Sequence, residues 1–295
     1  MRPFEYIGCE SVESAVGALD AYAGDAKILA GGTDLLLELR RPAALLPIAI
    51  VDVSRISSLQ GVTSLDGLIR IGPLTTHSEV SQSPLIRDRV AFLAAAAGAI
   101  GSPQIRNRGT IGGNIMNAAA CADTVPPLIA LGASLTLRSG RAERSVDIAD
   151  FFLKPYKTRA HANEMLTSVR FTQPAPNARS AFVKLGRRNA LSIARLSVAA
   201  MLVRDTHGVI TEARIVPGAA LPVWKRIGEA ESMLVGERPS TPLFAAAGRK
   251  VSEIMVGLTG RRWSTEYKDP VLAVLVRRSL EACCSENIPD SAARL

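Results

Sequence analysis

Two short segments that combine paired glycines with a threonine constrain this chain more than any other feature. In the first, an apolar run ends at Gly31-Gly32, and Thr33-Asp34 then lead into a leucine-rich run. This order predicts a strand, a tight turn and a helix. A strand that ends in glycines and opens a helix can present free backbone N–H groups to an anion. Taken alone, the segment also fits a purely structural turn.

The second segment is Thr110-Ile111-Gly112-Gly113-Asn114, which again contains a hydroxyl, paired glycines and an amide. Neither segment is a Walker A loop or a GxGxxG dinucleotide fingerprint. Two such segments favour a diphosphate held from both sides, as a dinucleotide requires. Asp123 carries a carboxylate suited to the hydroxyls of a ribityl or ribose chain. We also expect the Thr33 hydroxyl to cap the helix after the first segment and to donate to a phosphate oxygen.

Residues 1–55 predict a small α/β unit with parallel strands. Ser11 is a suitable N-cap, and apolar residues recur at helical spacing after it. The expected elements are a helix over 12–23, a buried strand over 26–30, a helix over 35–40 and a buried strand over 48–53.

Residues 56–177 predict a central α+β unit. Asp66-Gly67 lies within an alternating stretch and indicates a β-hairpin. The run from Thr76 to Glu79 matches a capping box. Ser83-Pro84 opens what we expect to be one long alanine-rich helix that ends near Gly98. Further elements are expected as an apolar helix after residue 125 and strands at 134–137 and 165–171.

Residues 178–285 predict a C-terminal unit in which helices cover a three-stranded sheet, and residues 286–295 read as a loose tail. The expected strands lie at 181–185, 196–203 and 209–216, and the expected helices at 225–234, 242–258 and 269–284.

Composition narrows the range of functions. The net charge is +8, but the basic residues are scattered and few aromatic residues accompany them, so we expect no nucleic-acid partner. No apolar run is long enough for a transmembrane helix, and the N-terminus lacks the apolar core of a signal peptide. Cys9, Cys121, Cys283 and Cys284 lack metal-ligand spacing, which argues against a zinc site or an iron–sulfur cluster held by this chain. We expect a cytoplasmic protein, with Cys121 a small buried residue.

No recognisable motif places side chains for acid–base or nucleophilic catalysis. His77, His161 and His207 show neither metal-ligand spacing nor a nucleophile partner, and we expect each to be solvated. The patterns GxSxG and HExxH are absent. The sequence therefore indicates a chain without catalytic side chains that holds a cofactor, and the cofactor would carry the chemistry.

Together, the two glycine segments resemble the FAD-binding (medium) subunits of the molybdenum hydroxylases, the group of xanthine dehydrogenase, carbon monoxide dehydrogenase and nicotinate dehydrogenase. The resemblance rests on ILAGGTDL and TIGGN and extends over nearly the whole chain, through IVDVSRISSLQGV, IRIGPLTTHSEV, NEMLTSVRF and FVKLGRRNALSIA. It implies an α+β fold, in which a two-subdomain FAD-binding fold of the vanillyl-alcohol-oxidase/PCMH type is followed by a small α/β C-terminal domain. That last domain would contain a three-stranded antiparallel sheet and helices.

The resemblance also implies which residues bind the cofactor. The first segment would wrap the FAD diphosphate, the second would hold it from the other side, and Asp123 would take a ribityl or ribose hydroxyl. Ile100 stands where some members place an aromatic residue against the flavin, and Lys157 and Arg159 match the family less directly. The implied FAD-binding residues are Ile28, Leu29, Ala30, Gly31, Gly32, Thr33, Asp34, Leu35, Ile100, Gly101, Thr110, Ile111, Gly112, Gly113, Asn114, Asn117, Asp123, Leu166 and Lys184.

By this resemblance the chain is the FAD-carrying electron-transfer subunit of a molybdopterin-dependent hydroxylase complex. Its partners would be a large molybdopterin subunit and a small [2Fe-2S] subunit, assembled as a dimer of heterotrimers. Electrons would pass from the [2Fe-2S] clusters via FAD, the only redox centre of this chain, to an acceptor such as NAD(P), with quinone and oxygen left open. The alternatives are a stand-alone FAD-dependent oxidase and a nucleotide-binding module without a redox role.

Overall fold

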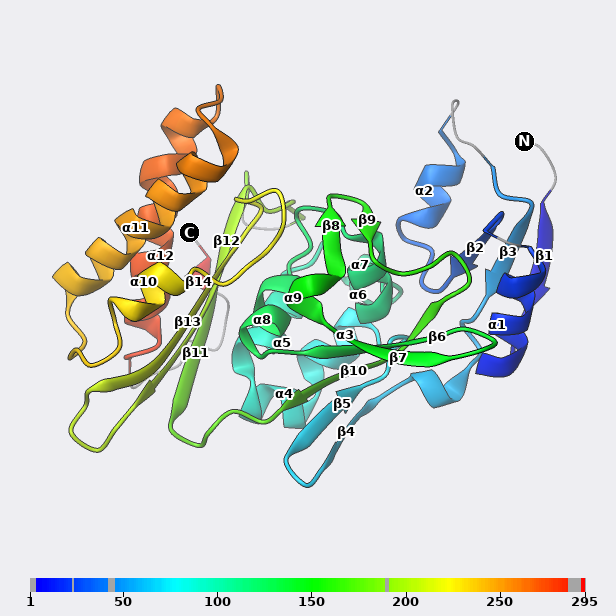
Figure 1. Ribbon diagram of the computed structural model, residues 1–295, viewed down its shortest axis with the longest axis horizontal. Helices are drawn as coiled ribbons and strands as arrows, with labels where there is room; N and C mark the ends of the chain where they lie inside the picture. The colour runs from blue at the N-terminus through cyan, green and yellow to red at the C-terminus, as the bar shows by residue number, and fades with distance from the viewer. Residues whose placement is uncertain (1–3, 23, 42–45, 189–190, 286–292, 295) are drawn as a thin grey trace.

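The computed structural model describes residues 4–22, 24–41, 46–188, 191–285 and 293–294. Three main sheets follow one another along the long axis of the molecule, and helices pack between and around them (Figure 1). The structure thus confirms an α+β chain, whereas the domain limits at residues 55 and 177 stay a prediction.

The N-terminal sheet is parallel, in the order β1-β3-β2, as predicted. Ser11 caps the first helix through a capping box. Strand β2 is partly exposed instead of buried, because it forms an edge of the sheet, while the central strand β3 is buried. The sequence pattern does not predict β1, whose four residues lack a clear alternation. The elements are β1 (Glu5–Gly8), α1 (Val12–Ala21), β2 (Ala26–Leu29), α2 (Leu35–Leu39) and β3 (Ala49–Asp52); residue 23, predicted to end the first helix, lies outside the described residues.

The central sheet is antiparallel, in the order β4-β5-β10-β6-β7. Strands β4 and β5 form the predicted hairpin, and Asp66 and Gly67 have φ of 50° and 76°, as a tight turn with two left-handed residues requires. A separate two-stranded hairpin, β8-β9, lies beside this sheet. The strands are β4 (Val62–Leu65), β5 (Leu68–Ile71), β6 (Ser134–Arg138), β7 (Glu143–Asp147), β8 (Phe152–Lys154), β9 (Lys157–Thr158) and β10 (Met165–Thr172).

Short helices cover the central sheet. The single alanine-rich helix that we expect is wrong, because the chain leaves the helical conformation at Val90, which has φ −143° and ψ 54°. Val90 is β-branched and only 1% exposed, so core packing of a poor helix former offsets the lost helical turn. The helices are η1 (Ser57–Leu59), α3 (His77–Gln82), α4 (Pro84–Arg89), α5 (Ala91–Gly98), α6 (Pro103–Arg106), α7 (Ile111–Asn117), α8 (Val125–Ala130) and α9 (Ile148–Phe151).

The C-terminal sheet contains the three predicted antiparallel strands and one short addition, β14, which pairs in parallel with β11. The last long helix begins at Thr265, earlier than the predicted residue 269, so Pro270 lies inside it. The helix predicted at 225–234 is limited to five residues. Of the predicted tail, residues 286–292 and 295 lie outside the described chain. The elements are β11 (Ala178–Leu185), β12 (Leu196–Arg204), β13 (Ile210–Gly218), α10 (Gly228–Ser232), α11 (Thr241–Thr259), α12 (Thr265–Ala282) and β14 (Ala293–Arg294).

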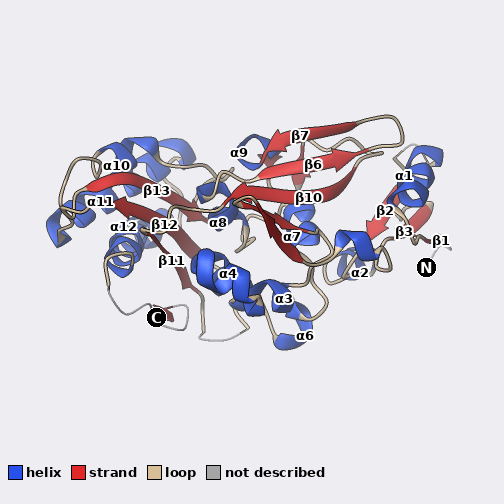
Figure 2. Ribbon diagram, turned by 90° about the horizontal axis from the view of Figure 1, so that it is seen from below, coloured by secondary structure: helices blue, strands red, loops and turns tan. Residues whose placement is uncertain are grey.

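Helices lie on both faces of the C-terminal sheet, which therefore joins two cores (Figures 1 and 2). Phe182 and Ala199 belong to the core of the central part, with helices α5 and α8. Their neighbours Val183 and Ala200 belong to the core under α11 and α12. Because side chains alternate along a strand, Lys184 shares the face of Phe182 and points toward the central part.

The N-terminal sheet is seated on the central part by apolar and polar contacts. The core of α1 and β3 includes Leu74 from the central part. Near the end of α1, Asn163 Nδ2 donates to Asp20 Oδ1 at 2.7 Å, and near its start Arg138 pairs with Glu13 at 2.8 Å. These exposed polar pairs contribute little stability.

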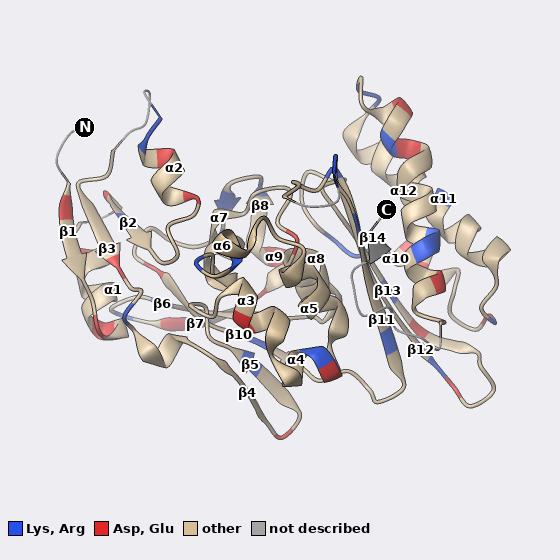
Figure 3. Ribbon diagram, turned by 180° about the vertical axis from the view of Figure 1, so that it is seen from behind, with Lys and Arg blue, Asp and Glu red and all other residues tan. Residues whose placement is uncertain are grey.

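Two kinds of feature are absent from the described residues. No helix among them is both long and apolar enough to cross a membrane. No group of His, Cys, Asp and Glu side chains within them has the geometry to hold a metal ion. Basic and acidic residues are interspersed over the molecule instead of forming one basic stripe (Figure 3).

Candidate functional site

The structure brings the two glycine segments together. A Cβ atom on Gly31 would lie only 1.9 Å from the carbonyl oxygen of Arg108. A Cβ atom on Gly109 would lie 3.4 Å from Thr33 Oγ1. The first segment, after β2, therefore runs directly over residues 108–109, which lead into the second segment at the start of α7.

The first segment keeps its backbone donors free. Among the described residues, none accepts a hydrogen bond from the N–H groups of Gly31, Gly32, Thr33 or Asp34. Thr33 does not cap α2, contrary to our expectation: Asp34 stands at the N-cap position, its backbone is already helical, and its side chain makes no capping bond. The Thr33 hydroxyl and four neighbouring N–H groups are thus available to a ligand.

Each glycine of the first segment also has a structural reason that involves no ligand. Gly31 lacks the side chain that would collide with the Arg108 carbonyl, and Gly32 has φ of 74°, in the left-handed region. Any other residue at Gly32 would be strained. Loss of cofactor in a Gly32 variant would therefore not identify the diphosphate contact, which stays a prediction.

The second segment forms the start of a helix. Thr110 is the N-cap of α7, and Gly112 and Gly113 lie in its first turn. The chain itself uses the N–H groups there: Ile111 N donates to Thr75 O at 3.0 Å, Gly112 N to Pro73 O at 2.8 Å, and Gly113 N to Thr110 Oγ1 at 3.0 Å. The chain itself therefore uses the N–H groups of Ile111 to Asn114, and the segment offers mainly side chains to a ligand.

His77 packs against Gly109, where the first segment contacts the residues that lead into the second. Its backbone N–H donates to Gly109 O at 3.0 Å, and a Cβ atom on Gly109 would lie 3.2 Å from its ring. His77 is 3% exposed, and its Nδ1 has no hydrogen-bond partner. Burial, with a smaller contribution from Arg106, lowers its pKa to about 4. The expectation of a solvated His77 is wrong, whereas His161 and His207 are exposed as expected.

Asp123 and Lys184 form a buried ion pair beside α7. Lys184 Nζ donates to Asp123 Oδ2 at 2.6 Å and to Ala99 O at 2.9 Å, next to Ile100 and Gly101. Asp123 Oδ1 is buried without a hydrogen-bond partner. Burial raises the pKa of Asp123 to about 6, and the Lys184 ammonium opposes this rise. An unpaired carboxylate oxygen in such a place is costly unless a donor meets it.

Asn114 and Cys121 lie at the same site. Thr124 donates to Asn114 Oδ1 at 2.7 Å, which leaves the Asn114 amide hydrogens for another acceptor. Cys121 is partly exposed, not buried as expected; burial and the carboxylates of Asp123 and Asp34 raise its pKa. Asp34 of the first segment and Asp123 are therefore close enough to act on one thiol.

Other predicted residues lie farther from the open donors. Leu166 is 4% exposed and belongs to the central core. Ile28, Leu29 and Ala30 are partly buried at the edge strand, as Leu35 is at the start of α2. Asn117 ends α7 without a hydrogen bond to another described side chain.

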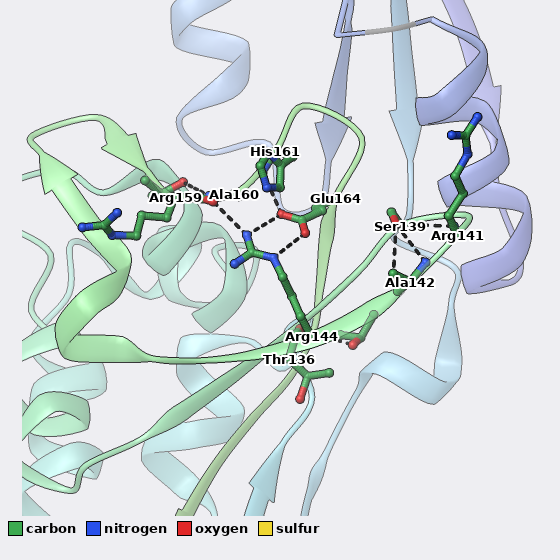
Figure 4. A network of polar contacts seen from close by, with 11 residues as sticks. Thr136, Ser139, Arg141, Ala142, Arg144, Arg159, Ala160, His161 and Glu164 are labelled. Carbon is green, nitrogen blue, oxygen red and sulfur yellow. Dashed lines mark hydrogen bonds and ion pairs between the residues drawn. The ribbon is translucent and has the colours of Figure 1, made fainter.

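A polar network fixes the chain between β9 and β10 (Figure 4). Arg144 donates to both oxygens of Glu164, at 2.6 and 2.8 Å, and to Arg159 O at 2.8 Å. His161 N also donates to Glu164, whose pKa is lowered chiefly by the Arg144 hydrogen bonds. The Arg159 guanidinium donates to Asp150 O, so this residue fixes a turn. The network holds in place the hairpin that carries Tyr156 (β8-β9).

Several residues of the site are missed by sequence reasoning. His77 and Thr124 act through tertiary contacts, and the capping-box signal at Thr76 correctly predicts a helix without revealing that His77 is buried beneath it. Tyr156 and Arg195 flank a cavity whose two sides are distant in sequence. No local signal could have joined them.

The residues present suit a ligand with a diphosphate and a polyol chain. The free N–H groups and the Thr33 hydroxyl are donors for phosphate oxygens. The unpaired Asp123 Oδ1 is an acceptor for a hydroxyl, and Lys184 is a cation fixed beside it. FAD contains each of these groups.

Two family models together match almost the whole chain. Residues 2–174 match the family described as the FAD binding domain in molybdopterin dehydrogenase. Residues 180–283 match the CO dehydrogenase flavoprotein C-terminal domain.

Individual relatives agree with these matches. The nicotinate dehydrogenase FAD-subunit of Eubacterium barkeri is 34% identical over 91% of this chain and 92% of its own length. The carbon monoxide dehydrogenase medium chain of Hydrogenophaga pseudoflava is 30% identical over 95% of this chain and 96% of its own. Among solved structures, carbon monoxide dehydrogenase from Hydrogenophaga pseudoflava superimposes with a TM-score of 0.89 at 31% identity, covering 96% of this chain and 99% of that chain. Quinoline 2-oxidoreductase from Pseudomonas putida 86 also gives 0.89, at 26% identity, covering 97% of this chain and 99% of that chain.

Proposed function

Because the chain belongs to the family of FAD-binding domains of molybdopterin dehydrogenases, we propose that it is the FAD-carrying electron-transfer subunit of a molybdopterin-dependent hydroxylase complex. In this role it passes electrons from the [2Fe-2S] clusters of a partner subunit to an external acceptor such as NAD(P). The same matches confirm the family resemblance and the fold class that we expect from the sequence.

The observation that carries the proposal is the combination of a buried Asp123 Oδ1 without a hydrogen-bond partner and the free donors of the first glycine segment. Gly31 to Asp34 donate N–H groups to the diphosphate, with the Thr33 hydroxyl beside them. Asn114 donates from the start of α7, and Asp123 accepts a ribityl or ribose hydroxyl. Thr110, Gly112 and Gly113 act indirectly, because they set the position of α7.

When bound, FAD supplies a redox centre that accepts electrons singly and releases them in pairs. The chain positions and tunes it. Lys184 holds a positive charge against Asp123 and the end of α5, where it faces any ligand seated beside Ile100. No side chain of the site needs to act as an acid or a base, in agreement with the absence of a catalytic motif.

The partners follow from the names of the relatives. Several are subunits or medium chains of dehydrogenases, which supports a large molybdopterin subunit and a small [2Fe-2S] subunit as partners here. We extend this to a dimer of heterotrimers in the cytoplasm.

The cofactor assignment can be tested on the purified chain. It is expected to be yellow and to release about one FAD per chain on denaturation, and Asp123→Ala is expected to lose most of it, because a buried acceptor disappears. Asp205→Ala, in an exposed turn, serves as the matched control. A folded wild-type chain that takes up no FAD would contradict the assignment. Substrate-dependent flavin reduction by the lone chain would instead support a stand-alone oxidase.

The complex needs a separate test. Expression with the neighbouring genes is expected to yield co-purification with a large molybdenum subunit and a small iron–sulfur subunit, and native mass spectrometry gives their stoichiometry. A chain that stays alone under these conditions would contradict the role of a subunit.

A further inference from the structure

A cavity of about 380 Å³ opens where the central and C-terminal parts meet. Its central side includes Cys121 and Tyr156, and its C-terminal side includes Arg195, Tyr267 and Lys268. Cys121 is two residues from Asp123, and the Asp123 and Lys184 charges both act on its pKa. The cavity therefore adjoins the proposed cofactor site but is lined by other residues.

Two cations, Arg195 and Lys268, line one side of the cavity, and a third, Arg262, lies near Lys268 outside the lining. Arg195 stacks its guanidinium 5.2 Å from the centre of the Tyr267 ring, and Lys268 Nζ donates to Ala219 O at 2.9 Å. Burial, Arg195 and then Arg262 lower the pKa of Lys268, so both arginines lie within electrostatic range of Lys268. None of the ion pairs in the described chain includes any of the three, and the described lining contains no Asp or Glu. Uncompensated like charges at a cavity favour an anionic ligand.

Aromatic rings and strained backbone lie at the same place. Tyr156, Trp263 and Tyr267 are 71%, 89% and 45% exposed and offer faces for a planar ring. Tyr156 and Ala219 line the cavity with φ of 61° and 54°. A bulky residue with positive φ is uncommon, and such strain concentrates at functional sites. The backbone N–H of Tyr156 donates to Ala118 O at 2.9 Å, which helps to hold Tyr156 in this conformation.

We propose that this cavity binds the electron acceptor and selects NADP over NAD, because Arg195 and Lys268 in its lining meet the extra phosphate. The inference rests on the proposed function, and it deepens it by choosing among the acceptors. A quinone or oxygen carries no charge that would need these cations. Sites that select NAD place a carboxylate on the ribose 2′-hydroxyl, whereas a neighbouring arginine accommodates the 2′-phosphate of NADP.

The test is titration of the FAD-loaded chain with NADP⁺ and, separately, with NAD⁺ by isothermal calorimetry. NADP⁺ is expected to bind about tenfold or more tightly than NAD⁺, since the cations form charge-assisted hydrogen bonds with its additional phosphate. Arg195→Gln is expected to weaken NADP⁺ binding about tenfold and NAD⁺ binding less. Arg262→Gln, on an exposed loop outside the lining, is expected to weaken NADP⁺ binding by a smaller factor. Lys250→Gln, on the far side of α11 in an exposed pair with Glu253, is the matched control.

Fluorescence locates the binding site independently. Trp263 is exposed at the cavity and Trp224 is buried, so NADP⁺ is expected to quench emission in the wild type and not in Trp263→Phe. Equal or tighter binding of NAD⁺, or unchanged NADP⁺ binding in both arginine variants, would overturn the proposal. FAD content is measured on the same samples, so a chain that holds FAD but fails these tests refutes the acceptor site alone. A chain without FAD contradicts the proposed function instead.

Discussion

The two glycine segments look alike in sequence and differ in what their backbones do. The first, Gly31 to Asp34, leaves four N–H groups without a partner among the described residues. The second, at the start of α7, gives the N–H groups of Ile111, Gly112 and Gly113 to Thr75, Pro73 and Thr110. A glycine pair before a helix is therefore not by itself an anion site, because tertiary acceptors decide whether its donors stay free.

The comparison assigns different tasks to the segments. The first can contact a ligand directly. The second begins a helix that presents Asn114, and residues 108–109 before it contact the first segment. Substitutions in the second segment should therefore act on stability, and those in the first should separate stability from cofactor binding.

Gly31→Ala is expected to have the largest effect, because it is the point where the segments touch. A Cβ atom 1.9 Å from a backbone carbonyl forces the two segments apart, which should cost about 1–3 kcal/mol of unfolding free energy and most of the bound FAD. Urea unfolding of the FAD-free chain measures the first effect. Gly17→Ala, in α1 with open space around it, is the control and should be neutral or slightly stabilising. Unchanged stability of Gly31→Ala would show that the contact is not close.

The buried His77 makes the free energy of unfolding depend on pH. Its pKa is about 4 in the folded chain against an ordinary 6.5, so the unfolded chain binds more protons between these values. Stability from neutral His77 is present above pH 6.5 and is lost as the pH falls toward 4. At about pH 5 the loss should reach roughly 2 kcal/mol relative to His77→Gln in urea unfolding. His161→Gln, at an exposed site, should follow the wild type.

Alanine substitutions of Thr33 and Thr110 distinguish cofactor binding by the first segment from stabilisation by the second. Thr110→Ala removes the N-cap of α7 and should lower the free energy of unfolding by about 1 kcal/mol in the FAD-free chain. Thr33→Ala removes no capping bond, so its stability should stay within about 0.5 kcal/mol of wild type while FAD binds several-fold more weakly. Equal stability losses in the two variants would remove the distinction.

Cys121→Ser is expected to have the smallest effect. The thiol makes no hydrogen bond to another described residue, and the substitution is nearly isosteric. FAD occupancy and the urea midpoint should both match wild type. A clear loss of flavin would place Cys121 in contact with the cofactor.

Local signals predicted most of the fold. The Asp66-Gly67 turn, the capping boxes at Ser11 and Thr76, and the three C-terminal strands are coded by adjacent residues, and all are present. The break at Val90 escaped prediction because packing there overrides the helical run of alanines.

The site was less predictable than the fold. Periodicity cannot show that Gly112 N donates to Pro73 O or that Asp123 reaches Lys184, because these contacts depend on how distant elements are brought together. The family resemblance supplied Lys184 and Asp123 as neighbours of one ligand. It gave no reason to expect the buried His77.

The contact of Gly31 with the Arg108 carbonyl has a thermodynamic consequence. A ligand that bridges both segments binds only the arrangement in which the N-terminal sheet is seated on the central part, so ligand binding and seating are linked. At a hundredfold excess over its Kd, such a ligand would stabilise seating by about 2.7 kcal/mol. By reciprocity, a change that lowers the population of the seated arrangement raises the apparent Kd of the ligand by the same factor. The exposed Arg138–Glu13 pair contributes little to this seating, so salt that screens the pair should change the apparent Kd only slightly.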